Sequence, residues 1–223
     1  MINLRLFVLG TMLMLYGISA GAQTVTLPLR EFVTKKYIHG VPYEDAKAYG
    51  RNVIPELTAL LADVSYEVYR PNIVSVMGMI GDPSAVLPLK NYLYGQKGEI
   101  SYSTFISVLA VFQALGYIAQ SGDPDALQML KNWSDPNYWN TAGLNFSYKS
   151  YKGPVMGEAI SSLALQGLGI SGREEALQHL EKVNSGASLA KRKPSFDSCV
   201  KSAIQLNKRV KTEGAVKVFG KTN

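Results

Sequence analysis

Cysteine and histidine are scarce in this chain of 223 residues. Its one cysteine, Cys199, excludes an intramolecular disulfide, and apolar neighbours at helical spacing predict a buried thiol. The two histidines, His39 and His179, lie far apart, and there is no His-Glu-x-x-His motif, glycine-rich phosphate loop or cysteine pair. These absences exclude common signatures of metal and nucleotide enzymes. We predict no metal, no cofactor and no catalytic residue, and we place His179 on a helix surface.

Acidic residues are the remaining candidates for acid–base chemistry. Glu158 and the pair Glu174-Glu175 are the best placed of them. All three stand near predicted helix starts, where a negative side chain is stabilised by the helix dipole. That structural role accounts for them, so an unrecognised enzyme is the least favoured hypothesis.

Long apolar runs are expected only at the start of the chain. Within residues 1–22, Arg5 is the only charged side chain, and an apolar run over 6–18 precedes small residues with an Ala-x-Ala ending. This order is typical of a secretory signal peptide and predicts cleavage between Ala22 and Gln23. An uncleaved anchor is less favoured, because a spanning helix needs about 20 apolar residues. We expect export to a periplasm or to the cell exterior.

Three segments of the chain share one pattern. A glycine is followed four residues later by alanine and eight residues later by leucine: Gly81, Ala85 and Leu89; Gly122, Ala126 and Leu130; Gly172, Ala176 and Leu180. The intervals between copies are 41 and 50 residues. Repetition at such periods indicates a stacked repeat architecture.

Each copy predicts the end of one helix and the start of the next. The glycine takes the left-handed conformation that ends a helix. Asp82 or Asp123 then caps the next helix, and Pro83 or Pro124 takes its first position. The third copy lacks Asp-Pro, but residues 171–174 have capping-box spacing. Alanine and leucine four residues apart share one face, which we expect to be buried.

This pattern of an apolar helix followed by Gly-Asp-Pro-x-Ala-x-x-x-Leu resembles the HEAT-like repeats named after the phycobilisome lyases. The resemblance covers residues 71–183, with weaker extensions over 52–61 and 195–212. It implies an all-α fold, in which antiparallel helix pairs stack into a short right-handed α-solenoid. The second helices of the pairs would line a concave face. Lyase activity is not carried over, because only the repeat skeleton matches.

These predictions divide the chain into three parts. Residues 1–22 form the signal peptide, 23–190 the HEAT-like repeat domain, and 191–223 a basic C-terminal helix and tail that caps the solenoid.

Some HEAT-repeat hydroxylases hold iron through His-Glu pairs, and no His-Glu pair occurs in this sequence.

The connection between the second and third copies is long and aromatic. It contains both tryptophans, and its candidate partner-binding residues are Trp133, Tyr138, Trp139, Phe146, Tyr148 and Tyr151. Loops of this length are often functional, and aromatic rings suit contact with peptides, glycans or cell-wall fragments. The alternative is that the rings fold back over the helices, which we favour for Trp133. For Tyr138 and Trp139 both alternatives stay open.

Positive charge is concentrated at the C-terminal end. The chain carries a formal net charge of +6, and from Ala187 onward nine Lys and Arg face two acidic residues. Candidate contacts with an anionic surface are Lys191, Arg192, Lys193, Lys201, Lys208, Arg209 and Lys211. They would attract lipid headgroups or surface polymers. The favoured alternative is the solvated outer face of a capping helix. Export and the absence of interleaved aromatics argue against nucleic acid.

The favoured function is an exported, non-catalytic binding or scaffold protein, monomeric on its own. A protein or peptide partner would be held by the concave face and by the aromatic loop 133–151. The alternative is association with an envelope surface through the basic tail. An unrecognised enzyme ranks last.

Overall fold

The structure is a computed structural model that describes residues 27–186 and 193–220. Within these ranges the chain is almost entirely helical, which confirms the predicted all-α class. The expected signal peptide lies outside the described residues, as do Lys191 and Arg192.

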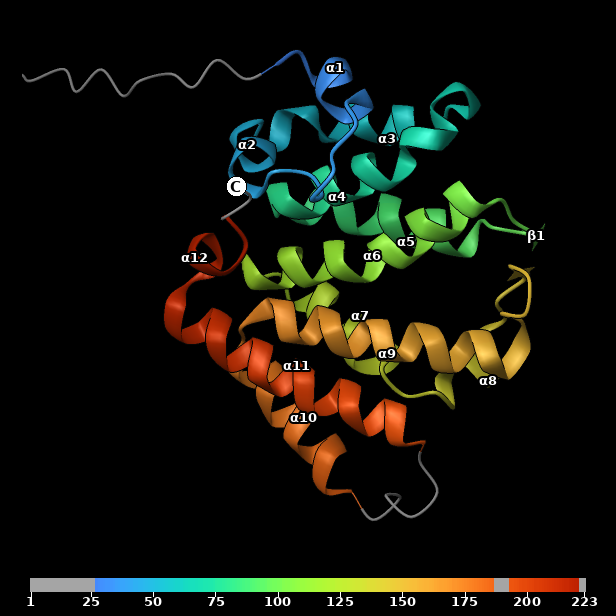
Figure 1. The fold of residues 1–223 in the computed structure, drawn as a ribbon, viewed down its shortest axis with the longest axis vertical. Helices are drawn as coiled ribbons and strands as arrows, with labels where there is room; N and C mark the ends of the chain where they lie inside the picture. The colour runs from blue at the N-terminus through green and yellow to red at the C-terminus, as the bar shows by residue number, and fades with distance from the viewer. Residues whose placement is uncertain (1–26, 187–192, 221–223) are drawn as a thin grey trace, which may run out of the picture.

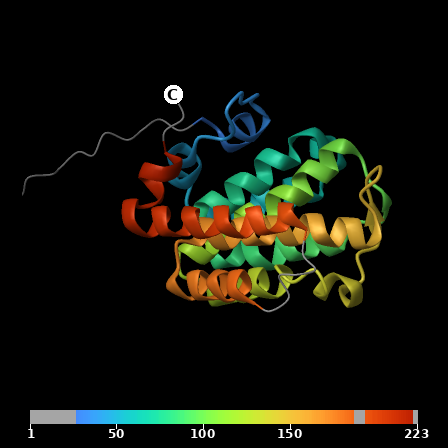
Figure 2. The same cartoon turned by 60° about the horizontal axis from the view of Figure 1, so that its bottom comes forward.

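Eight longer helices form two layers. The first layer contains α4 (Arg70–Ile80), α6 (Tyr102–Gln120), α9 (Gly153–Ser171) and α11 (Pro194–Glu213), each packed against the next. The second contains α3 (Ile54–Ala62), α5 (Val86–Tyr94), α7 (Pro124–Trp133) and α10 (Glu174–Ser185), which pack on helices of the first. The chain progresses along the longest axis of the molecule (Figure 1), and α10 lies beneath α11 in Figure 2.

Short elements complete the fold. The remaining α-helices are α1 (Leu29–Thr34), α2 (Tyr43–Ala48), α8 (Tyr138–Ala142) and α12 (Ala215–Phe219), and 3-10 helices span Arg51–Val53, Val64–Tyr69 and Pro83–Ala85. Two parallel strands, β1 (Gly98–Glu99) and β2 (Phe146–Ser147), pair Gly98 with Phe146 and Glu99 with Ser147. This pairing ties the connection after α7 to the loop before α6.

The predicted helix-ending glycine is confirmed at two of the three repeat boundaries. Gly81 ends α4 and Gly172 ends α9 in the left-handed conformation, with φ of 75° and 59°. At the second boundary α6 ends at Ser121, and Gly122 follows with φ of 107°. The Asp82 carboxylate accepts a hydrogen bond from the Ser84 backbone N–H at 2.9 Å, and Asp123 accepts one from that of Ala126 at 2.7 Å. The repeat alanines and leucines are fully buried in all three copies. The sequence register of the helix pairs is therefore correct.

The capping box expected at residues 171–174 is wrong. Ser171 is the last residue of α9, and it is not the N-cap of α10. Its Oγ donates to the Leu168 carbonyl oxygen at 2.7 Å and accepts from the Arg173 backbone N–H at 3.3 Å. Arg173 occupies the N-cap of α10 without a side-chain cap. Asn207 of α11 adds a tertiary contact at this boundary, where it donates to the carbonyl oxygens of Leu168 and Arg173 at 2.9 and 3.3 Å. The third boundary is stabilised by tertiary contact.

Close approach of the first-layer helices depends on small residues. A Cβ added to Gly116 in α6 would lie 2.6 Å from the Gly167 carbonyl oxygen in α9. A Cβ added to Gly78 in α4 would lie 2.3 Å from the Ala114 Cα. Real Cβ atoms do not approach other heavy atoms this closely, so glycine is required at both positions.

Helix α6 is the apolar centre of the first layer. Among the described residues it is the one helix long and apolar enough to cross a membrane, and 61% of its most apolar stretch is buried inside the molecule. This corrects the expectation that no stretch after residue 22 has that length and composition. The apolar helix α6 packs against α4 on one side and against α9 on the other.

The last described helix returns to the beginning of the chain. Phe219 of α12 places its ring 6.1 Å from that of Tyr43 in α2 and 5.2 Å from that of Tyr117 in α6. In Figure 1, α12 accordingly lies next to α2, although α11 begins at the far end of the molecule. The first and last parts of the described chain are thereby held together.

Candidate functional site

Half of the aromatic loop residues are buried. Trp133, Trp139 and Phe146 are 1%, 6% and 5% exposed. The Trp139 indole Nε1–H donates to the Trp133 carbonyl oxygen at 2.9 Å, and the two rings lie 5.6 Å apart. These three residues offer no surface to a partner, which corrects their expected binding role.

Two features explain why these rings fold inward. Gly157 of α9 faces Trp139, and a Cβ there would lie only 3.0 Å from the Trp139 Cβ, so glycine makes room for α8. Phe146 is held by the β1–β2 pair, in which the Gly98 N–H donates to the Asn145 carbonyl at 2.8 Å. The connection is therefore a packed part of the fold.

The three tyrosines of the loop are more accessible. Tyr138 is half-buried, with its hydroxyl 3.3 Å from that of Tyr94. Tyr148 stacks on Phe105 at 4.4 Å, and Tyr151 is 39% exposed. Of the predicted aromatic set, Tyr151 is the one that both reaches the surface and lines a cleft.

Most of the predicted basic residues that the structure describes are paired with carboxylates. The pairs are Lys193 with Glu158, Lys208 with Glu181 at 3.1 Å, Arg209 with Glu213 at 3.2 Å, and Lys211 with Glu174. The last two of these carboxyl groups have lowered pKa values, caused first by their hydrogen bonds to Arg209 and Lys211. Such exposed pairs are worth little in stability. They do lower the positive potential that an anionic surface would meet.

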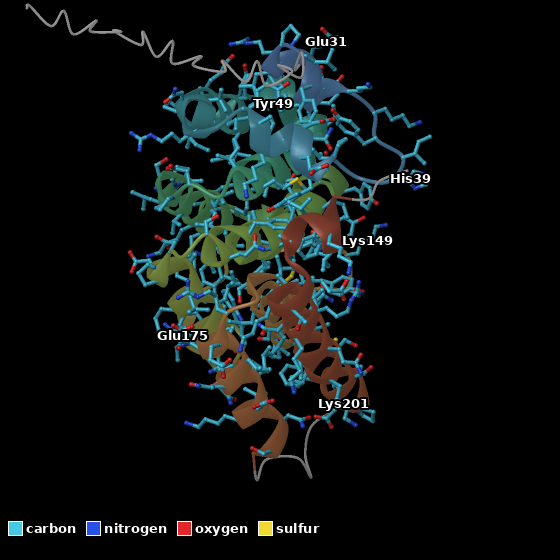
Figure 3. The ribbon with its side chains drawn as sticks, turned by 90° about the vertical axis from the view of Figure 1, so that its left-hand side faces the viewer. Glu31, His39, Tyr49, Lys149, Glu175 and Lys201 are labelled. Atoms are coloured by element: carbon cyan, nitrogen blue, oxygen red, sulfur yellow. The ribbon has the colours of Figure 1, made fainter. Side chains whose placement is uncertain are left out.

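Lys201 differs from these residues. It is exposed on the outer side of α11, and no carboxylate pairs with it in the described part of the chain. Figure 3 shows Lys201 and Glu175 of α10 on opposite sides of the lower half of the molecule.

A cleft of about 840 Å³ opens between the start of α9, the end of α10, the start of α11 and the connection after α7. Its lining residues are Ser134, Asp135, Pro136, Asn137, Tyr151, Val155, Glu158, Ala159, Ser162, His179, Lys182, Val183, Gly186, Lys193, Ser195 and Phe196. This volume is within the usual range of ligand clefts.

One wall of the cleft is apolar. Val155 and Ala159 come from successive turns of α9, and Phe196 faces them from the first turn of α11. Val155 is 50% exposed although it is a large hydrophobic residue. Tyr151 extends this apolar wall toward the loop. The wall can therefore bury the apolar side chain of a ligand.

Ser134, His179 and Lys182 form a polar part of the lining, called here the polar end, and it contains a serine–histidine contact. Ser134 Oγ lies 2.9 Å from His179 Nε2 and donates to the Lys131 carbonyl oxygen at 2.7 Å. Serine has one hydroxyl proton, so when Ser134 donates it to the Lys131 carbonyl oxygen, the contact with His179 requires an Nε2–H that donates to Ser134. A nucleophilic serine needs the reverse, a histidine nitrogen that accepts its proton. Ser134 is also 2% exposed and cannot readily reach a substrate.

His179 titrates in an unusual environment. Burial lowers its pKa below the ordinary value of 6.5, and the positive charges of Lys131 and Lys182 lower it further, while Asp135 opposes them. His179 is thus half-buried at the edge of the cleft, which corrects its expected place on a helix surface. His39 is exposed in the upper half of the molecule and does not meet it (Figure 3).

The described residues contain no cluster of three or more His, Cys, Asp or Glu that could hold a metal ion. Cys199 is half-buried on α11, so its thiol is less enclosed than expected.

Comparison of the chain with protein-family models, curated proteins and solved structures gives no match. The HEAT-like resemblance therefore stays a prediction, carried by the internal repeats alone.

Ser134, His179 and Lys182, at the polar end of the cleft, were not predicted as site residues from the sequence. A weak signal for His179 was present. It follows Ala176 by three residues and precedes Val183 by four, so it borders the buried stripe of α10. Nothing local in the sequence places Ser134 opposite it.

Proposed function

We propose that this chain is an exported, non-catalytic binding protein whose cleft holds a peptide segment of a protein partner. The observation that carries the proposal is the cleft itself, with its apolar wall at Val155 and Phe196 and its polar end at His179. A partly open cleft with one apolar wall and a few polar groups suits an extended peptide. The site proposed here replaces the aromatic loop as the centre of binding, with Tyr151 retained.

A binding role is favoured over catalysis by the chemistry of the polar end. Ser134 is buried, and its hydroxyl lies 2.7 Å from the Lys131 carbonyl oxygen as well as 2.9 Å from His179, so it is poorly placed to attack a substrate. Glu158, the other candidate for acid–base work, is engaged by Lys193.

The architecture we propose is the short right-handed α-solenoid of HEAT-like pairs. Support comes from the three aligned boundaries at Gly81, Gly122 and Gly172 and from the two-layer packing of successive helices. The ion pairs of α11 fit the outer face of a terminal capping helix, and we expect a monomer in the absence of the partner.

Association with an envelope surface is the second candidate, favoured by the exposed Lys201 on α11. We rank it below peptide binding, because four of the other basic residues are paired with carboxylates.

Export is testable by mass. Protein recovered from the envelope fraction should begin at Gln23, because of the Ala-x-Ala ending before it. An intact mass that retains residues 1–22 would refute cleavage.

Peptide binding is tested by filling the cleft. A random peptide library, displayed and selected on residues 23–223, should yield peptides that bind the wild type. Ala159→Trp, which places a large side chain in the cleft, should abolish their binding. The matched control is Ala59→Trp on the exposed face of α3, which should bind like wild type. Loss in both variants, or in neither, would refute the proposed site.

A further inference from the structure

Four aromatic rings lie in a row at the end of the molecule that carries β1 and β2. Tyr148 stacks on Phe105 with ring centroids 4.4 Å apart, and Tyr151 lies 5.4 Å from Phe105. Tyr102, the first residue of α6, lies 6.2 Å from Tyr148. We call these four rings the aromatic row. In Figure 1, β1 lies on the opposite side of the molecule from α12.

The aromatic row is exposed at both of its ends. Phe105 is buried, whereas Tyr102 is 66% exposed and Tyr151 is 39% exposed. An exposed aromatic side chain presents a large apolar face together with a polar hydroxyl. Tyr102 therefore keeps most of its surface open to a ligand in the described structure.

Lys149 stands beside this row in a backbone conformation that favours glycine. It is the first of two residues in a hairpin turn between Tyr148 and Tyr151, whose backbones exchange hydrogen bonds of 3.0 and 2.9 Å. Its φ is 50°, and no other non-glycine residue within 27–186 and 193–220 has a positive φ. Glycine suits such a turn position because it has no Cβ. A strained residue of this kind points to a use for its side chain.

The Lys149 side chain brings positive charge to the aromatic row. Its Nζ lies 5.1 Å from the centre of the Tyr148 ring. Lys97 precedes β1 and Lys152 follows Tyr151 in the sequence, and both are exposed like Lys149. In the described part of the chain, none of these three lysines forms an ion pair. Their ammonium groups are therefore available to a ligand.

Two carboxylates lie near the aromatic row. Glu99 belongs to β1 and is exposed. Glu67 accepts a hydrogen bond from the hydroxyl of Ser101, the residue before α6. Three lysines against two carboxylates leave one net positive charge on this surface.

We propose that the aromatic row and Lys149 form a second binding site, which takes an acidic polysaccharide. The apolar face of a sugar ring would stack on Tyr102, and the carboxylate or sulfate group of the sugar would lie at Lys149. The site shares Tyr151 with the peptide cleft, but Tyr102, Tyr148 and Lys149 do not belong to the cleft lining. It therefore goes beyond the proposed function and does not depend on it.

Shape and charge favour a sugar over other anionic ligands. One face of a sugar ring consists of C–H groups that can cover an aromatic ring, while its hydroxyl groups stay in water. Its acid group gains a charge-assisted hydrogen bond from Lys149. Single-stranded nucleic acid needs a groove whose positive charge follows the backbone. Here Glu99 and Glu67 accompany the three lysines, which makes the surface too weakly positive for such a polymer.

The experiment applies residues 23–223 to an array of oligosaccharides. Uronic, sialic and sulfated chains are placed beside the same chains without the acid group. The strongest acidic ligand is then titrated by calorimetry into wild type, Lys149→Gly, Lys149→Arg and Tyr102→Ala. The controls are Lys201→Gln, which removes a lysine of α11, and Ala159→Trp, which fills the cleft.

We expect acidic oligosaccharides to bind about tenfold or more tightly than their neutral counterparts. Lys149→Gly and Tyr102→Ala should each lower the affinity about tenfold or more, and Lys149→Arg should retain it because the charge is kept. The melting temperature of Lys149→Gly should be unchanged or higher, since glycine relieves the turn. Both controls should bind the sugar like wild type.

Three results would overturn this inference and leave the peptide cleft untouched: no bound oligosaccharide, equal binding of acidic and neutral chains, or unchanged affinity in Lys149→Gly. A melting temperature of Lys149→Gly lowered by several degrees would show that the lysine serves the fold, and would overturn it too. Loss of sugar binding in Ala159→Trp would place the sugar in the cleft instead. Tighter binding of single-stranded DNA or of an acidic peptide than of any oligosaccharide would also contradict the proposed ligand.

Discussion

Asn207 of α11 donates from Nδ2 to the Leu168 carbonyl oxygen of α9 at 2.9 Å. The same amide reaches the Arg173 carbonyl at 3.3 Å. The side chain is fully buried, so the hydrogen bond to Leu168 forms away from water, while the one to Arg173 lies at a half-buried residue. They link the C-terminal end of α9 and the residue before α10 to α11.

Asn207→Ala should lower the free energy of unfolding by about 1–3 kcal/mol, because the buried Leu168 carbonyl and the half-buried Arg173 carbonyl lose this donor. Gln205→Ala, an exposed position on the same helix, should change it by less than about 0.5 kcal/mol. Urea denaturation of both variants measures the difference. Equal effects would show that the buried amide is not a structural link.

Gly116→Ala should destabilise the protein by about 1–3 kcal/mol, since the new methyl group meets the Gly167 carbonyl. The sign of the change in unfolding free energy is informative, because replacing glycine by alanine inside an isolated helix stabilises that helix by about 1 kcal/mol. Gln113→Ala on the exposed side of α6 is the control. A stabilised Gly116→Ala variant would contradict the close packing of α6 on α9.

Leu89→Ala should cost about 2–5 kcal/mol of stability, as the loss of a buried leucine does. Leu87→Ala, two residues earlier on the same helix and 62% exposed, should be near neutral. Chemical denaturation of the pair tests the repeat register. Similar midpoints for the two variants would place the buried face elsewhere.

Trp139→Ala should cost about 3–5 kcal/mol, because the ring is buried and bonded to the Trp133 carbonyl. Tyr151→Ala should leave the melting temperature nearly unchanged but weaken peptide binding at the cleft. Thermal melts and peptide titrations on the same samples distinguish the two roles. A stable Trp139→Ala variant would show that the loop is not part of the core.

His179 should titrate below its ordinary pKa of about 6.5 in an NMR experiment. Its folded pKa is lower than the unfolded one, so its contribution to stability is present above about pH 6.5 and is lost as the pH falls through the folded pKa. Lys182→Gln should raise the pKa of His179, and Lys201→Gln should not. No response to Lys182→Gln would show that Lys182 does not influence the imidazole.

Local signals predicted the helix boundaries at Gly81 and Asp123, because the turn conformation and the cap depend on neighbouring residues. At the third boundary Gly172 also ends its helix as predicted, but the predicted cap is wrong. Ser171 stays in its helix, and the additional donor, Asn207, comes from a distant part of the sequence. A capping motif tells where a helix can start, and tertiary contact decides whether the motif is used.

The same distinction explains the site. Aromatic composition indicated that the connection after α7 is special, but the burial of Trp139 depends on the facing Gly157, which no local pattern connects to it. His179 and Ser134 are likewise joined only by the packing of α10 near the end of α7. Residue types in a sequence can suggest candidate site residues, but the packing of separate helices determines where the site lies.

The contact of Phe219 with Tyr43 joins α12, the last described helix, to α2 near the start of the described chain. The row of helix pairs is therefore closed by a contact between its first and last parts. A row with two free ends can be lengthened by one more pair without disturbing the others. Here an added pair would carry α11 away from α2, and α12 of five residues could not bridge the gap. The number of helix pairs is therefore set by the reach of the C-terminal return.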